Sequence, residues 1–132
     1  AIKEESVTDQ KNSLTVCLDN ILRHAGITRN TEYDLAQGKT AIQILEENMT
    51  GVQVLDLSGC SLDAVLYYVN QDIPVLAILE DGEAVLVTGF NEFNVVIMEP
   101  STGKLYKKGM NDATTWFAEN GNHFISYMKI DN

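Results

Sequence analysis

Hydrophobic residues in the first half of the chain recur at the three- and four-residue spacing of amphipathic helices. The first such stretch can be capped by Asn12 or Ser13, and it ends at Gly26, a residue type that easily adopts the left-handed backbone of a helix end. Its apolar face consists of Leu14, Cys17, Leu18, Ile21, Leu22 and Ala25. A polar turn or short helix follows at 29–37, and the same spacing predicts further helices at 40–50 and 61–69.

The second half of the chain has the short apolar runs and turn residues of antiparallel strands. Asp81-Gly82 is a strong hairpin signal. Strands are predicted at 52–57, 75–79, 84–90, 95–98 and 104–107, and in a last segment with Phe124, Ser126, Met128 and Ile130 on one side. A helix capped by Asn111 or Asp112 precedes that last strand. We therefore expect one α+β domain spanning 1–132, with its helices on one side of an antiparallel sheet.

The chain is strongly acidic, with 19 Asp and Glu residues against 9 Lys and Arg residues and a formal net charge of −10. Because such a surface repels phosphate groups, we expect neither nucleic acid nor an anionic membrane as a partner. No apolar stretch approaches the ~18 residues of a membrane-spanning helix, so we expect no membrane insertion. The two cysteines and two histidines lack the spacing of a zinc site, and we expect no metal or cofactor.

The order of elements, with a cysteine in the first long helix and an antiparallel meander at the end, resembles the papain-like cysteine peptidases. The closer resemblance is to the bacteriocin-processing (double-glycine leader) peptidases. In that family a strand of the form His-x-Val-Val-Val-x-Gly-Tyr is followed by a strand that ends in Asp-Pro. The matching segments here are 73–75 (Ile-Pro-Val), 83–90 (Glu-Ala-Val-Leu-Val-Thr-Gly-Phe), 95–100 (Val-Val-Ile-Met-Glu-Pro) and, for the nucleophile helix, 17–26. The resemblance covers nearly the whole chain and implies a papain-like fold.

The same resemblance implies which residues would form the site. Cys17 takes the position of the nucleophile, Glu83 that of the family's histidine and Glu99 that of its aspartate. Gln10, seven residues before Cys17, is the loose counterpart of the glutamine that stabilises the oxyanion. Leu18 follows the cysteine where the family has glycine. A carboxylate at position 83 repels a thiolate, and once protonated it is no longer a base, so it replaces histidine poorly.

Neither histidine of the chain is expected to supply the missing base. His24 follows Cys17 by two turns of the same helix, about 10 Å along the axis and beyond hydrogen-bond reach. His123 enters the last strand, away from the nucleophile helix in this layout. Cys17 itself can be read as a small buried core residue, because free cysteine commonly behaves as one.

The resulting hypothesis is a catalytically degenerate cysteine-peptidase-like domain that acts as a peptide- or protein-binding or structural module. The alternative is an active cysteine peptidase or amide hydrolase that uses Cys17 with a non-standard base. A binder of small ligands in an acidic groove is a third possibility. The resemblance implies a bacterial protein that is secreted, displayed at the cell surface or part of a larger chain, and it leaves compartment and oligomeric state open.

Overall fold

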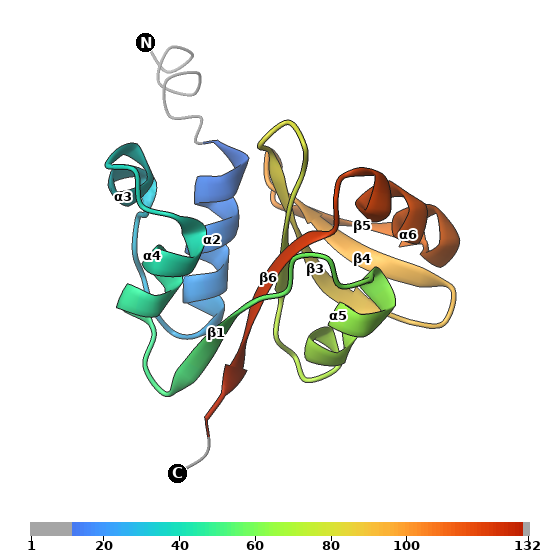
Figure 1. The fold of residues 1–132 in the computed structure, drawn as a ribbon, viewed down its shortest axis with the longest axis horizontal. Coiled ribbons are helices and arrows are strands. Elements are labelled where there is room, and N and C mark those ends of the chain that lie inside the picture. The colour runs from blue at the N-terminus through green and yellow to red at the C-terminus, as the bar shows by residue number, and fades with distance from the viewer. Residues whose placement is uncertain (1–11, 131–132) are drawn as a thin grey trace.

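The computed structural model describes residues 12–130, and in this part of the chain five helices pack on a six-stranded sheet (Figure 1). The helices are α2 (Ser13–His24), α3 (Glu32–Ala36), α4 (Ala41–Asn48), α5 (Leu62–Val69) and α6 (Met110–Glu119). The strands are β1 (Val52–Asp56), β2 (Val75–Ile78), β3 (Ala84–Phe90), β4 (Asn94–Glu99), β5 (Lys104–Gly109) and β6 (His123–Lys129). The sheet order is β1-β6-β2-β3-β4-β5, with every neighbouring pair antiparallel. The predicted α+β class is confirmed.

Short polar side chains start three of these helices at the residues that the sequence predicts. The capping residues are Asn12 in α2, Thr40 in α4 and Ser61 in α5, and each accepts a hydrogen bond from a backbone amide of the first turn. In α4 the side chain of Gln43 also accepts from the Thr40 amide at 2.9 Å, which completes a capping box. These bonds provide partners for helix-end amides that the helix itself leaves without one.

The last helix begins differently from the prediction. Helix α6 starts at Met110 with Gly109 in the cap position and no side-chain cap, so the prediction of Asn111 or Asp112 as its cap was wrong. Strand β5 ends at Gly109, and the chain therefore passes from strand to helix without a loop. The Met110 amide donates to the Phe93 carbonyl at 2.7 Å, which ties this junction to the turn before β4.

Helices cover both faces of the sheet, which corrects the prediction that they lie on one side (Figure 1). Helices α2 and α4 pack on one face, here called the α2 face, and α5 and α6 pack on the other. Along β3, Ala84 and Leu86 join the core under α2, whereas Val85 and Val87 join the core under α5 and α6. A strand buried on both faces has a continuous apolar run, as β3 does, whereas a strand covered on one face alternates apolar and polar residues.

Strand β6 lies inside the sheet, between β1 and β2, and it too is buried on both faces. The predicted one-sided pattern holds only for its first half. Ile125 and Tyr127, on the opposite side from the predicted set, are buried in the core under α2, while Met128 and Ile130 are exposed. None of the helices within residues 12–130 combines the length and the apolar character needed to cross a bilayer.

Candidate functional site

The N-terminus of α2 meets the start of β3. Ser13, the first residue of α2, accepts through its Oγ a hydrogen bond of 2.8 Å from the Ala84 amide. The preceding residue, Glu83, is exposed in the β2–β3 turn, where its amide donates to Asp81 Oδ1 at 2.9 Å. Helix α2 therefore begins beside the segment for which the sequence resemblance predicts the position of the family's histidine. The α2 residue that bonds there is Ser13, and Cys17 lies one helical turn farther along.

Cys17 is enclosed in the protein core. It is 0% exposed and belongs to the apolar cluster between α2, α4 and the sheet, as does Leu18 after it. Burial, and after it the negative charge of Glu99, raises the pKa of Cys17 to about 12. At neutral pH the residue is therefore a protonated thiol, the weakly nucleophilic form of cysteine.

Among the other predicted site residues that the structure describes, Glu99 interacts with Cys17. Glu99, at the end of β4, is half-buried and close enough for its charge to act on Cys17. One of its oxygens, Oε1, accepts from the amide and the hydroxyl of Ser101, both at 3.3 Å. Gln10 falls outside the described residues. Among residues 12–130, no group of three His, Cys, Asp or Glu side chains is arranged to hold a metal ion.

Both histidines have partners elsewhere. His24 Nε2 donates to the backbone carbonyl of Asp72 at 2.8 Å and lies 3.8 Å from the carboxylate of the same residue. His123 Nε2 lies 3.8 Å from Glu80 Oε1. Within residues 12–130, the charged group that shifts the pKa of Cys17 is Glu99, and its negative charge opposes formation of the thiolate.

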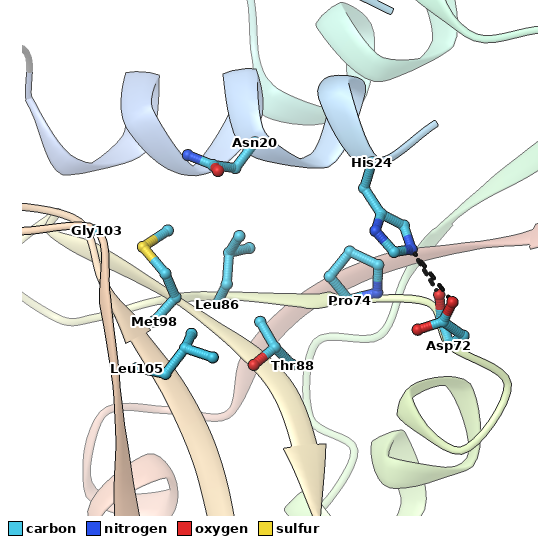
Figure 2. A pocket seen from close by; sticks show the side chains of 9 residues that line it. All are labelled: Asn20, His24, Asp72, Pro74, Leu86, Thr88, Met98, Gly103 and Leu105. Carbon is cyan, nitrogen blue, oxygen red and sulfur yellow. Dashed lines mark hydrogen bonds and ion pairs between the residues drawn. The ribbon is translucent and has the colours of Figure 1, made fainter. Parts of the chain in front are cut away.

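A pocket of about 360 Å³ opens farther along α2, between the helix and strands β3, β4 and β5 (Figure 2). Its lining residues are Asn20, His24, Asp72, Pro74, Leu86, Thr88, Met98, Gly103 and Leu105. Asn20 and His24 follow Cys17 by three and seven residues, so they continue the helix face on which the cysteine lies. The pocket and the buried thiol thus share one side of one helix.

The pocket has an apolar floor and a polar margin. Leu86 and Met98, paired across β3 and β4, form the floor, while Leu105 on β5 is 61% exposed at the far wall. Thr88 is the extra residue where the register of β3 and β4 shifts, a β-bulge of the kind that redirects a side chain. The polar groups on the helix side are those of Asn20 and His24 (Figure 2). Such a lining suits an apolar group attached to a polar backbone.

Sequence reasoning missed this pocket. The available signal was that Asn20 and His24 are polar residues on the same helical stripe as Cys17. The opposite wall could not be predicted, because it depends on the pairing of β5 with β4 and on the bulge at Thr88.

Comparison with known proteins gives a likeness in fold. No family model matches the chain, and no curated protein matches it. A crystal structure from Bacillus anthracis, provisionally described as a C39-like peptidase, is similar with a TM-score of 0.75 and 17% sequence identity. The match covers 94% of this chain and 91% of that chain. The chain therefore has the α+β fold of the C39-like, papain-like cysteine peptidases.

Proposed function

We propose that the chain is a catalytically degenerate cysteine-peptidase-like domain that binds a peptide or protein partner without cleaving it. The observation that carries this proposal is the state of Cys17, which is 0% exposed and has a pKa of about 12. A cysteine nucleophile must reach the carbonyl carbon of its substrate and attack it as a thiolate. A buried, protonated thiol meets neither requirement.

The carboxylates support the same proposal. Glu83 and Glu99 take the positions that the sequence resemblance gives to histidine and aspartate. The charge of Glu99 favours the protonated thiol and thus opposes activation. General acid–base catalysis of amide cleavage also needs a group that takes the thiol proton and passes it to the leaving amine. Glu99 near the neutral thiol is an anion and cannot stabilise a thiolate.

The pocket beside α2 is the proposed binding surface. Its volume of about 360 Å³ lies at the small end of the range of about 300–1,000 Å³ for ligand pockets, which suits one or two side chains of a peptide. The floor of Leu86 and Met98 would bury an apolar side chain. The hydroxyl of Thr88 lies where a peptide backbone could bond to it (Figure 2). The amide of Asn20 already donates to the Val16 carbonyl and accepts from Arg23, so it would contribute its second N–H and the second lone pair of its oxygen.

The proposal is tested with short capped peptides added to isotope-labelled protein. We expect Ala-Leu-Ala and Ala-Phe-Ala to shift the NMR amide signals of residues 20, 24, 86 and 88, and Ala-Lys-Ala to leave them in place. The variant Leu105→Glu should weaken these shifts, whereas Tyr67→Glu, at an exposed site on α5, is the matched control. Mass spectrometry of the same samples follows cleavage. Cleavage that disappears in Cys17→Ala would contradict degeneracy, and unchanged signals at all four residues would contradict binding in the pocket.

A further inference from the structure

Strand β5 carries a positive charge, whereas the chain as a whole is negatively charged. Three of the nine basic residues of the chain lie in this strand, namely Lys104, Lys107 and Lys108. No Asp or Glu occurs between Pro100 and Asn111. The remaining chain holds six basic residues against all 19 acidic ones. An anionic segment that most of the surface repels is therefore attracted to this strand.

Strand β5 is also an edge of the sheet. Its six residues pair with β4, from Asn94 opposite Gly109 to Glu99 opposite Lys104, and none of the strands within residues 12–130 pairs with its outer side. An edge strand presents backbone N–H and C=O groups that another extended chain can pair with. The opposite edge, β1, has the sequence Val-Gln-Val-Leu-Asp and carries no cation.

The side chains of β5 alternate between the two faces and are mostly exposed. Leu105 is 61% and Tyr106 38% exposed, and both lie between the lysines. Lys108 is half-buried, with its Nζ 4.9 Å from the centre of the Trp116 ring on α6. Lys104 faces Glu99 across the ladder, whereas Lys107 faces the uncharged Val96. Lys107 is thus the lysine whose charge has the least compensation.

Lysines on an edge strand commonly prevent unwanted pairing with other chains. A partner strand for β5 must therefore be compatible with these lysines. A second copy of this chain would place one lysine-rich β5 against another, and like charges on facing strands are destabilising. Protection by charge alone also does not account for two neighbouring exposed apolar residues, Leu105 and Tyr106. An acidic strand would neutralise the lysines and cover those two residues at the same time.

We propose that β5 binds an extended acidic segment of a partner protein, which adds to the sheet as a seventh, antiparallel strand. Antiparallel pairing matches every other pair in this sheet. The partner residues opposite Lys104, Lys107 and Lys108 would be Asp or Glu, and those opposite Leu105 and Tyr106 apolar. Read along the partner, the pattern is acid-acid-apolar-apolar-acid. This edge adjoins the pocket beside α2, because Leu105 of β5 also forms the far wall of that pocket.

The test is an NMR titration with the capped peptide Thr-Glu-Glu-Val-Val-Glu-Thr. We expect amide shifts concentrated in β5 and β4, and protection of β5 amides from hydrogen exchange. Lys107→Glu should weaken binding about fivefold or more, since an attractive cross-strand pair becomes a repulsive one. The matched control Lys39→Glu removes a positive charge that pairs with Glu47, away from β5, and should leave the affinity unchanged.

Two further probes separate strand addition from simple charge attraction. A peptide with Lys in place of Glu should not bind, and neither should the acidic peptide with N-methylated valines, which keeps its charge but loses two backbone donors. Equal binding of the N-methylated peptide, or of a single-stranded oligonucleotide of the same charge, would overturn the proposal. So would the absence of shifts in β5. Shifts at residues 20 and 24 with apolar peptides, without any at β5 with the acidic one, would remove this inference and leave the proposed function standing.

Discussion

The two halves of helix α2 face the same sheet but have different surroundings. In the first half Ser13 accepts a hydrogen bond from β3, and Cys17 is enclosed by the core. In the second half Asn20 and His24 border a pocket of about 360 Å³. Under the proposed function, the burial of Cys17 makes the cysteine of a papain-like layout unreactive. In this chain the accessible space lies beyond the thiol, toward the end of the helix.

The largest expected effect is a difference in unfolding free energy between a variant of the buried pocket floor and a variant of its exposed wall. Leu86 and Leu105 both line the pocket, but Leu86 is 3% exposed and part of the core under α2, whereas Leu105 is 61% exposed. Leu86→Ala should lower the free energy of unfolding by about 2–5 kcal/mol. Leu105→Ala should change it by less than about 0.5 kcal/mol. Urea unfolding measures both, and similar losses would break the distinction between a closed floor and an open wall.

The next effect concerns the pH dependence of stability. The pKa of Cys17 is about 12 in the folded chain and about 8.5 in an unfolded one, so the unfolded chain loses the thiol proton first. The stabilising contribution is complete below about pH 8.5 and declines as the pH rises toward 12, by up to about 1.4 kcal/mol per pH unit. Between about pH 9 and 11 the wild type should lose about 2–3 kcal/mol more than Cys17→Ala. Parallel pH profiles of unfolding free energy would contradict a deeply buried thiol.

A smaller effect tests the anchor at the start of α2. Ser13→Ala leaves the Ala84 amide without its side-chain acceptor and should cost about 1 kcal/mol of unfolding free energy. The matched control is Ser58→Ala, whose hydroxyl bonds to Asp56 on an exposed part of the surface and should matter less. Both are measured by thermal or urea unfolding. An equal cost for the two serines would mean that the contact between α2 and β3 contributes nothing specific.

Local sequence signals predicted most elements of the fold. Asn12, Thr40 and Ser61 are helix caps, and Asp81-Gly82 joins two strands as predicted. The two-sided cover of the sheet was missed although the continuous apolar run of β3 favours it, because a strand covered on one face alternates apolar and polar residues. The cap of α6 also escaped prediction. There the pairing of β5 with β4 carries the chain into the helix and leaves Gly109 at the cap.

The candidate site was predictable only in part. The resemblance selected Cys17 as the position of the nucleophile, but Cys17 also lies on the apolar face of α2, where a free cysteine is commonly a buried core residue. The cap at Asn12 was the better signal, since it places Ser13 in the first turn and Cys17 beyond it. Cysteines are activated at helix N-termini and deactivated by apolar burial. The degree of burial depends on how α2 packs, which the local sequence does not determine.

The central claim, that Cys17 is a core residue and not a nucleophile, is tested most directly by timed alkylation of the native protein. Iodoacetamide labelling is followed by mass spectrometry at each cysteine between about pH 6 and 9. We predict that Cys17 reacts at least about 100-fold more slowly than in the urea-unfolded chain and that half-buried Cys60 reacts first. Labelling of Cys17 at about pH 6, faster than a free thiol and ahead of Cys60, would contradict the account.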